Sequence, residues 1–396
     1  MPHDDVVILS AARSPIGKFQ GALSEMPAPE LGAAAIRAAL ARAGLDPARV
    51  AEVIMGNVVS AGLGQAPARQ AAIAAGLPEQ VGALTVNKVC GSGLKAVMLA
   101  ASSIAAGDGD FYVAGGMENM NRAPYLLTKA RFGYRLGNAE LVDAVVHDGL
   151  WCAFEQQHMG LAAEWIAEAF GVTREAQDEF ACLSQQRAAA ASAAGRFRTE
   201  IATVSVPQRK GPPLSFEADE ALRPDTTVDA LRRLKPAFKE GGSVTAGNAP
   251  GITDGAAALV VARRSAARAA GLQPIARVLG YAQAAVRPLE IFTAPVFALR
   301  RLADRLGVAA TDFDLYELNE AFAAQAVANI RELALDLEKV NVNGGAIALG
   351  HPIGASGARV LTTLLYALRD RGLARGAAAL CLGGGEAVAL AVEIEA

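Results

Sequence analysis

The sequence predicts an α/β protein made of two similar halves, with a mostly parallel sheet covered by helices. Strand-like and helix-like segments alternate through the first 120 residues and again through the C-terminal third, which is the pattern of β/α units. The segments 91–104 and 355–368 share one helical pattern, and each is followed by a strand with a glycine-rich motif. Residues 121–250 interrupt the alternation, so we interpret them as an insertion in the first half. The alternative is two ordinary β/α segments that share common turns.

In the first half, apolar and β-branched runs predict strands, and apolar residues spaced three and four apart predict helices. One helix stops at Gly44, because glycine readily takes the left-handed conformation of a helix end. A second helix begins near Leu94 and ends at Gly107. The predicted strands are DVVILSAAR at 5–13, AEVIMGNVVS at 51–60, ALTVNKVC at 83–90 and DFYVAGGMEN at 110–119.

The C-terminal third follows the same order. Leucines at 361, 364, 365 and 368 form one face of a helix within 355–368. In the insertion, TREAQDEFACLSQQRAAAASAAG at 173–195 predicts a long helix. Further strands are expected in DGAAALVVARRSAARAAG at 254–271, PIARVLGYAQAAV at 274–286, FDLYELNEAF at 313–322 and GAAALCLGGGEAVALAVEIE at 376–395.

Composition places the chain among globular proteins. Apolar residues make up 52% of the 396 residues and charged residues 19%, which excludes a disordered chain. The net charge of −3 offers no basic face for a nucleic acid. Acidic residues near the N-terminus do not fit a secretion signal, and no run of about 18 to 20 apolar residues predicts a membrane span. We therefore expect a cytoplasmic protein with no nucleic-acid or membrane partner.

The cysteines and histidines are few and scattered. No two cysteines form a C-x-x-C pair, and the four histidines are equally dispersed. This spacing argues against both a zinc cage and a disulfide framework, so no metal site is expected. The four cysteines are Cys90, Cys152, Cys182 and Cys381.

Three glycine-rich loops each carry one reactive side chain: Cys90 in VCGSG, His351 in GGAIALGHPIGASG and Cys381 in LCLGGGEA. Glycines let backbone N–H groups approach a ligand, and the helix start after Cys90 favours a thiolate. A nucleophilic thiol needs a base, which a histidine can supply. Cys90 and His351 precede equivalent helices, so we expect these helix starts to meet at one cleft. Taken singly, the alternatives are two core cysteines and a turn-capping histidine.

A fourth candidate is Asn319, in YELNEAFAAQ at 316–325. It follows an apolar strand and precedes a helix, so a helix N-cap is the alternative. The functional interpretation is an amide that holds a water or polarises a carbonyl.

At these residues the sequence resembles the thiolases. The motifs NKVCGSGLKAV, GNAPGITDGAAA, NEAFA and NGGAIALGHPIGASGAR fall in that family's order and spacing, and the resemblance covers essentially the whole chain. It implies two duplicated β/α halves in a five-layered α-β-α-β-α core with an inserted loop domain. The implied boundaries are 1–120 with 251–272 for the N-terminal half, 121–250 for the loop domain and 273–396 for the C-terminal half.

The resemblance also implies roles for single residues. By it, Cys90 is the nucleophile that becomes acylated, and His351 activates Cys90 and helps to bind the thioester oxygen. Cys381 is similar to the cysteine that removes and returns the α-proton. Asn319 is similar to the residue that holds a water in one oxyanion hole, and the N–H groups of Cys90 and Gly383 would form the other. Such chemistry needs a covalent acyl-enzyme, a base for the carbanion and fixed donors for each oxyanion.

For the substrate, the resemblance implies coenzyme A thioesters and no permanently bound cofactor. It places CoA along 223–239, a segment with five basic and two acidic residues that is otherwise a solvated helix face. Arg223 would lie near the nucleotide, with Leu234, Ala237 and Phe238 along the pantetheine. His158 and Met159 match a substrate-pocket pair, although spacing alone favours a core or turn histidine at 158. Ala246, Pro250, Ala321 and Phe322 complete the implied binding set.

Within the family, NKVCGSGLKAV resembles acetyl-CoA acetyltransferases more than the long-chain degradative thiolases. Cys381 favours the reversible thiolase reaction over that of ketoacyl synthases. The expected reaction is the condensation of two acetyl-CoA molecules to acetoacetyl-CoA and CoA, by a ping-pong mechanism through an acyl group on Cys90. The alternatives are a 3-ketoacyl-CoA thiolase of broader specificity and a catalytically silent scaffold that binds CoA esters.

Some positions depart from the family's pattern. Pro250 stands where many members have a serine that hydrogen-bonds pantetheine, and proline lacks both N–H and hydroxyl. Ile291-Phe292 and Glu386-Ala387 also differ from the usual pairs. The segment KARFGYRLGN at 129–138 resembles a loop of tetrameric members. We therefore expect a homotetramer, arranged as a dimer of dimers.

Overall fold

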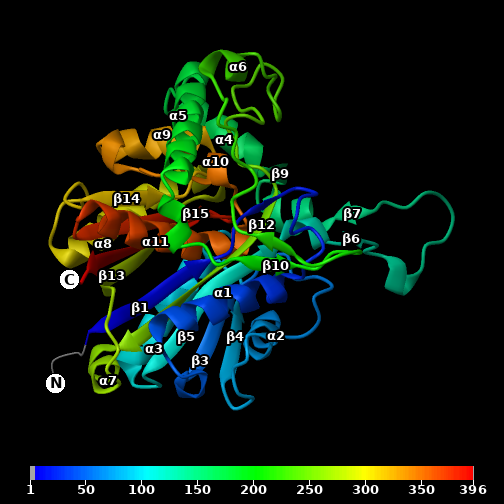
Figure 1. Cartoon of the computed structure of the whole chain (residues 1–396). Coiled ribbons are helices and arrows are strands. Elements are labelled where there is room, and N and C mark those ends of the chain that lie inside the picture. The colour runs from blue at the N-terminus through cyan, green and yellow to red at the C-terminus, as the bar shows by residue number, and fades with distance from the viewer. Residues whose placement is uncertain (1–4, 396) are drawn as a thin grey trace.

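The computed structural model describes residues 5–395 and contains one large sheet that runs through both halves of the chain (Figure 1). Its strands are β1 (Val6–Arg13), β2 (Gly17–Lys18), β3 (Glu52–Gly56), β4 (Gly82–Val86), β5 (Phe111–Asn119), β12 (Thr253–Arg263), β13 (Ala276–Ala285), β14 (Leu315–Leu318), β15 (Arg375–Leu382) and β16 (Glu386–Ile394). They follow the order β14-β15-β16-β13-β1-β12-β5-β3-β4, and β2 pairs with β12. β1 and β13 join the halves through two residue pairs, Val7 with Arg277 and Ile8 with Ala276.

The two halves repeat the same pairing. The series β1-β12-β5-β3 corresponds to β13-β16-β15-β14, with antiparallel, antiparallel and parallel pairs in turn. β4 extends the first series, and an isolated parallel bridge from Tyr316 to Val340 takes its place in the second. The helices α3 (Ser92–Ala106) and α11 (Ile353–Arg371) follow equivalent loops. The predicted duplication is therefore present.

The prediction of a mostly parallel sheet is wrong. β12 and β16 run antiparallel to both of their neighbours. β15 and β16 are joined by the turn at 383–385, where Gly384 and Gly385 have φ of 90° and 88°. A glycine turn of this kind makes a hairpin and needs no crossover helix. The reversal of β16 therefore lies in a short glycine run, which does not disturb the alternation of strands and helices.

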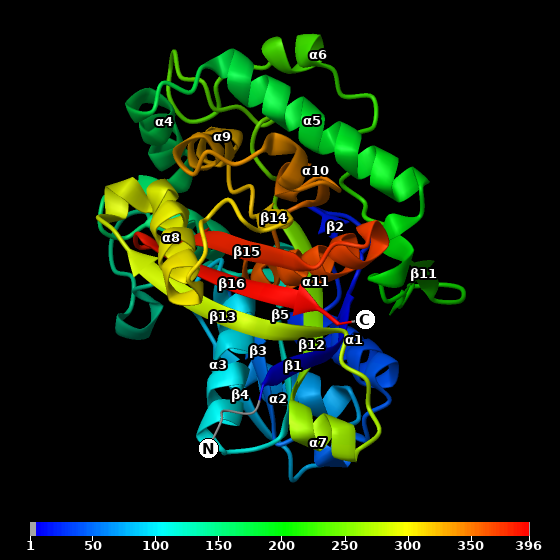
Figure 2. The same cartoon turned by 90° about the vertical axis from the view of Figure 1, so that its left-hand side faces the viewer.

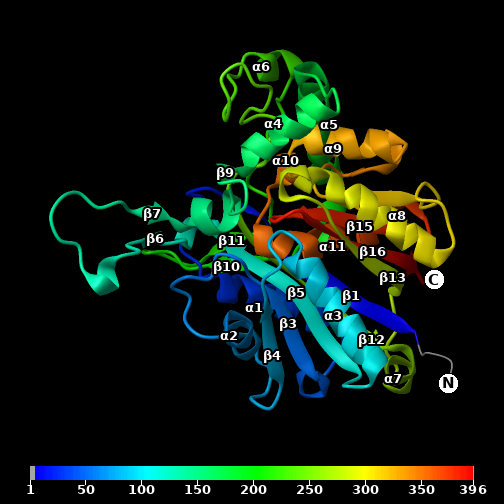
Figure 3. The same cartoon turned by 180° about the vertical axis from the view of Figure 1, so that it is seen from behind.

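α3 and α11 lie together between the strands of the two halves (Figures 2 and 3). Their leucines, such as Leu94, Leu361 and Leu364, belong to one buried cluster with residues from both sets of strands. α1 (Ala28–Ala43) and α2 (Pro67–Ala74) cover the outer face of the first half, whereas α8 (Ala294–Leu306) and α9 (Ala323–Glu332) cover that of the second. The layers are therefore helix, sheet, helix, sheet, helix. The short helices α7 (Arg264–Ala269) and α10 (Ala346–Leu349) complete these halves.

Two glycines let α3 and α11 touch through their backbones. A Cβ on Gly93 would lie 2.7 Å from the backbone nitrogen of Ala358, and one on Gly357 would lie 2.3 Å from that of Leu94. Gly93 and Gly357 hold the same position in the two repeated segments. Because no side chain separates the helices here, the loops before them are brought to the same place.

Among residues 5–395, one segment has the length and composition of a membrane span, Val89–Ala106, with a mean hydropathy of 1.5. It consists of α3 and the loop before it. Since α3 packs between the two sets of strands, its apolar character is accounted for by the core.

Residues 120–252 lie between β5 and β12 and carry their own elements. α5 confirms the long helix predicted at 173–195. In Figure 1 the chain between β6 and β7 projects away from the body of the molecule. The boundaries proposed for this domain stay a prediction. Its helices are α4 (Met159–Ala169), α5 (Arg174–Ala193) and α6 (Val228–Arg232), and its hairpins pair β6 (Tyr125–Leu126) with β7 (Val142–Asp143), β8 (Trp151–Cys152) with β9 (Gln157–His158), and β10 (Val204–Val206) with β11 (Leu214–Phe216).

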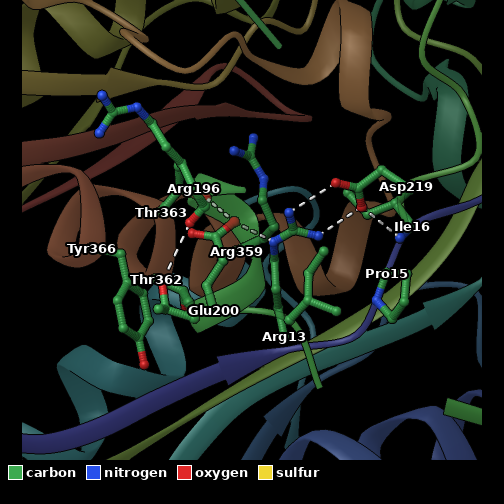
Figure 4. Close-up of polar contacts among 12 residues, drawn as sticks. Arg13, Pro15, Ile16, Arg196, Glu200, Asp219, Arg359, Thr362, Thr363 and Tyr366 are labelled. Atoms are coloured by element: carbon green, nitrogen blue, oxygen red, sulfur yellow. Dashed lines mark hydrogen bonds and ion pairs between the residues drawn. The ribbon is translucent and has the colours of Figure 1, made fainter. Parts of the chain in front are cut away.

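A buried ionic cluster holds this segment against the first half (Figure 4). Arg13, at the end of β1, donates from Nε to Glu200 at 2.6 Å and from both terminal nitrogens to Asp219 at 2.7 and 2.9 Å. Thr363 of α11 donates to the same Glu200 carboxylate at 3.3 Å. A buried guanidinium shared by two carboxylates is costly to break, because each partner is left charged and unpaired. The cluster therefore fixes the segment to both β1 and α11.

The contact between α3 and α11 predicts the effect of a single methyl group. In Gly357→Ala the new Cβ meets backbone atoms, which cannot rotate away, so the free energy of unfolding should fall by about 1–3 kcal/mol. Chemical denaturation measures the change. The control is Gly82→Ala, where a Cβ would make ordinary contacts of 3.7 Å or more. Equal stability of the two variants would show that the helices do not rely on this contact.

Candidate active site

The turn before α3 presents Cys90 from an unusual backbone. Val89 has a φ of 44°, in the left-handed region that β-branched residues rarely adopt. The chain therefore bends sharply between β4 and α3. Cys90 follows this bend, is partly exposed, and lines a cavity.

One cavity brings together the reactive side chains of the three predicted loops. Cys90 comes from the start of α3, His351 from the loop before α11, and Cys381 from the end of β15. Gly383, just beyond β15, lines the same cavity. Residues nearly 300 positions apart in the sequence therefore face one space.

His351 has a defined tautomer. The hydroxyl of Ser356 donates to the carbonyl oxygen of Pro352 at 2.9 Å, so its oxygen is left to accept from Nδ1–H of His351, 2.6 Å away. On the other side of the ring, the amide nitrogen of Asn319 lies 3.4 Å from Nε2. Both contacts fit a proton on Nδ1 and a lone pair on Nε2, toward which the Asn319 amide donates. Burial, with the positive charge of Arg359, lowers the pKa of His351 to about 3, so the ring is a neutral base.

Cys90 is a thiol until a base removes its proton. Enclosure by protein raises the pKa of Cys90 to about 12, and the Glu118 carboxylate adds to this, while the N–H groups of Cys90 and Gly383 act in the opposite direction. Both N–H groups therefore favour negative charge on the sulfur, and Cys90 and Gly383 line the same cavity. A proton acceptor such as Nε2 of His351 is what the thiol requires.

Cys381 is buried at 2% exposure. Burial raises the pKa of its thiol well above the ordinary value, and the charge of Cys90 raises it further. Because both sulfurs lie in one cavity, a negative charge on one disfavours a negative charge on the other. Once deprotonated, Cys381 is a strong base in a poorly solvated place.

Asn319 is not the N-cap of the helix that follows, because the N-cap of α9 is Phe322. Its Oδ1 is buried without a hydrogen-bond partner, which is uncommon for a buried carbonyl and indicates a place for a water or a substrate donor. The neighbouring Glu320 points elsewhere. It accepts from Ser184, Asn341 and the backbone of Ile347, so it fixes the strand end that carries Asn319.

Glu118 is a buried carboxylate close to the same loops. It accepts from the backbone nitrogens of Val58, Val59 and Gly354 and from the amide of Asn57. Burial raises its pKa to about 7, against these hydrogen bonds. The carboxylate therefore ties the start of α11 to the ends of β3 and β5.

Strand register shows that Glu118 and Cys381 are equivalent. β3 and β5 pair at Gly56 with Gly116, and β14 and β15 pair at Leu318 with Ala379. Two residues beyond these pairs come Glu118 and Cys381, and one residue beyond Gly56 and Leu318 come Asn57 and Asn319. Glu118 faces the start of α11 as Cys381 faces that of α3.

An aromatic wall closes the cavity on the side of the inserted segment. Phe238 stacks on His158 with ring centroids 4.8 Å apart, and Phe322 meets Phe238 and Phe292 edge to face. His158 is both a lining residue and the N-cap of α4, because its Nδ1 accepts from Gly160. His158 therefore caps a helix and lines the cavity at the same time, so the two alternatives left by the sequence do not exclude each other. Met159, Ala321 and Pro250 also line this cavity.

The remaining predicted substrate residues lie farther out. Arg223 and Ala246 line a neighbouring cavity, which shares Ala249, Gly251 and Ile252 with the first. Leu234 is exposed and packs at Gly247, and Ala237 donates its N–H to Val244. These two residues line neither cavity. Most of the predicted substrate-binding residues thus line one of two adjoining cavities.

Sequence reasoning missed Ser356, Glu118 and Glu320 as supports of the site. Ser356 lies inside the histidine motif and Glu118 inside VAGGME, so both were in segments already singled out. What they bind depends on contacts across the two halves, and no local pattern carries that information. Among residues 5–395, no cluster of three or more His, Cys, Asp or Glu side chains is placed to hold a metal ion.

Comparison with known proteins identifies the family of this chain. The family model described as "Thiolase, N-terminal domain" matches residues 6–265, and that described as "Thiolase, C-terminal domain" matches 272–394. The chain belongs to the thiolase family. This confirms the resemblance found in the sequence.

Similar thiolases cover the whole chain. Acetyl-CoA acetyltransferase of Cupriavidus necator is 56% identical over 389 residues, which cover 98% of this chain and 99% of that protein. That of Pseudomonas aeruginosa is 57% identical over 386 residues, with 98% of each chain covered. The crystal structure of the Bacillus anthracis acetyl-CoA acetyltransferase matches with a TM-score of 0.97 at 43% identity, covering 99% of each chain. The chain therefore has the thiolase fold and is an acyltransferase whose family uses CoA thioesters.

The neutral state of His351 predicts a pH dependence of stability. Its pKa falls from 6.5 to about 3 on folding, so the unfolded chain binds a proton that the native thiolase does not. The stabilisation is complete above pH 6.5 and is lost as the pH falls toward 3. His351→Asn should remove this loss, so that wild type declines more steeply than the variant by up to about 1.4 kcal/mol per pH unit.

Urea unfolding of both proteins between about pH 4 and 7 measures the difference. Glu118 and other carboxylates titrate in both proteins, so their contribution cancels. Parallel curves would mean that His351 is protonated as easily in the native state as in the unfolded one.

Proposed function

We propose that this thiolase catalyses the reversible condensation of two acetyl-CoA molecules to acetoacetyl-CoA and CoA, through an acetyl group on Cys90. The observation that carries the proposal is the shared cavity of Cys90, His351 and Cys381, with Nε2 of a neutral imidazole free to accept a proton. The names of the Cupriavidus necator and Pseudomonas aeruginosa relatives support acetyl-CoA as the substrate.

In the first half-reaction, the sulfur of Cys90 attacks the thioester carbonyl while Nε2 of His351 accepts the thiol proton. The oxyanion forms beside the N–H groups of Cys90 and Gly383, two residues that line the cavity together. The bond to CoA then breaks, and the CoA sulfur takes a proton from Cys381. The products are an acetyl-Cys90, an imidazolium, a Cys381 thiolate and free CoA.

In the second half-reaction, the Cys381 thiolate removes an α-proton from a second acetyl-CoA. The imidazolium and the amide of Asn319 are the donors next to the developing enolate oxygen. The carbanion attacks the acetyl group, the new carbon–carbon bond forms, and the bond to Cys90 breaks. The Cys90 sulfur takes its proton back from His351, so all three groups return to their starting states.

The two adjoining cavities offer a place for each part of an acyl-CoA substrate. We assign the acyl group to the part of the apolar cavity near Cys90, His158 and Met159, the pantetheine to the side of Phe238, and the nucleotide end of CoA to the side of Arg223. CoA esters enter as substrates, with no permanently bound cofactor. A thiolase of broader chain length is the alternative. Thiolysis of acetoacetyl-CoA measured against a longer 3-ketoacyl-CoA separates the two, because preference for the longer chain contradicts the acetyl-specific proposal.

We further propose a cytoplasmic homotetramer. The projecting loop between β6 and β7 exposes large apolar side chains, including Phe132 at 90% and Leu136 at 103% of full exposure. Apolar side chains so exposed on a projecting loop are typical of a contact surface. The loop resembles that of tetrameric thiolases, as the sequence indicated.

Trapping the intermediate tests the mechanism. Exposure of the intact protein to acetyl-CoA should add one acetyl group, which peptide mass spectrometry should locate on Cys90. Cys90→Ala should gain no acetyl group and should lose activity by more than about a thousandfold. Cys182→Ala, remote from the cavity lining, is the matched control and should be acetylated normally. An adduct on another residue would contradict the assigned nucleophile.

The loop can be tested apart from the chemistry. Leu136→Glu places a charge in the proposed contact between dimers, so native mass spectrometry should show dimers where the wild type shows tetramers. Phe297→Glu, on the exposed face of α8 at 45% exposure, is the control and should leave the tetramer intact. A wild-type protein that is dimeric at all concentrations measured would refute the tetramer.

A further inference from the structure

Two separate loops carry Cys90 and Gly383, which line one cavity and whose N–H groups favour negative charge on the sulfur of Cys90. One is the turn at 87–91 before α3, and the other is the glycine turn at 383–385 between β15 and β16. The first contains Val89 in the left-handed region, and the second contains Gly384 and Gly385 at positive φ. Valine rarely adopts the first conformation, and the glycines make the second turn flexible, so the spacing of the two N–H groups depends on contacts between the loops.

An ion pair connects these two loops. Nζ of Lys88 donates to Oε2 of Glu386 at 2.6 Å. Lys88 is two residues before Cys90, and Glu386 is three residues after Gly383. The loops also approach closely beside the pair, because a Cβ on Gly383 would lie 3.1 Å from Cγ1 of Val89.

The surroundings of the pair favour a stable contact. The side chains of Lys88 and Glu386 are 19% and 38% exposed, so the pair is partly shielded from solvent. The backbone nitrogen of Lys88 donates to the Ser92 hydroxyl at 2.8 Å, which fixes the lysine to the first turn of α3. Lys95 is a second cation near Glu386. Burial and the positive charge of Lys88 lower the pKa of Lys95, whereas the negative charge of Glu386 raises it.

We propose that Lys88 and Glu386 are positioning residues that hold the N–H groups of Cys90 and Gly383 at the distance the oxyanion requires. Neither residue lines the cavity, so the pair acts through the loops and does not touch the acyl group. Glu386 is one of the positions at which this chain departs from the family's usual residues, and the departure thus has a function. The inference rests on the proposed role of Cys90.

The first test separates positioning from binding. Glu386→Gln and Lys88→Met should each lower kcat by about three- to fivefold, as expected for a partly exposed pair, and should change KM less than twofold. The double variant should lose no more than either single variant, because the two residues act as one unit. Lys88→Arg should retain at least half of the wild-type kcat. Losses that multiply in the double variant would overturn the pairing.

A second measurement needs no acyl-CoA. The rate at which iodoacetamide alkylates Cys90 at fixed pH should fall by a similar factor in Glu386→Gln, because the same N–H groups stabilise the thiolate. Wild-type kcat and alkylation rates in Glu386→Gln would overturn the inference without affecting the proposed function, which the acetylation of Cys90 tests separately.

A matched control separates the proposed positioning from a general effect of losing an ion pair. Asp110 forms a pair of similar exposure with Arg263 at 2.7 Å, at the end of β5 opposite to Glu118. Asp110→Asn should leave kcat, KM and the alkylation rate unchanged. If Asp110→Asn lowers kcat and alkylation as much as Glu386→Gln does, the effect is a general one of lost ion pairs and the inference is wrong.

Discussion

The backbone contact between α3 and α11 is the constraint on which the site depends. Gly93 and Gly357 leave no side chain between the helices, so the loops before them open into one cavity. Cys90 and His351 are carried by those loops. The surrounding strands of both halves cover the helix pair with apolar side chains, and the ionic cluster around Arg13 fixes the inserted segment in place. The catalytic arrangement is thus a property of how the two halves meet.

Burial then decides the charge states within the cavity. Loss of solvent raises the pKa of Cys90 and of Cys381 and lowers that of His351, so all three groups rest in the neutral form. A site prepared in this way holds no fixed charge that must be desolvated before a thioester enters. Charge is created during the reaction, where backbone N–H groups and the amide of Asn319 are already in place.

Much of the fold and of the site could be predicted from the sequence, because the signals for them are local. Helix ends at Gly44 and Gly107, the repeated segments and the three glycine loops are visible in short windows. The antiparallel direction of β12 and β16 was not predictable, since strand direction depends on partners far along the chain. The support given by Ser356 and Glu118 was hidden for the same reason. His158 shows the intermediate case, in which a local cap and a remote cavity use one side chain.

The equivalence of Glu118 and Cys381 has a consequence for stoichiometry. The duplicated fold places equivalent loops before the two central helices, α3 and α11. At the start of α11 stands the buried carboxylate of Glu118, which accepts from the backbone nitrogens of Gly354 and Val58. At the start of α3 the equivalent position is Cys381, which lines the open cavity. The side chain at this position therefore accounts for one such site in each polypeptide, although the fold is duplicated.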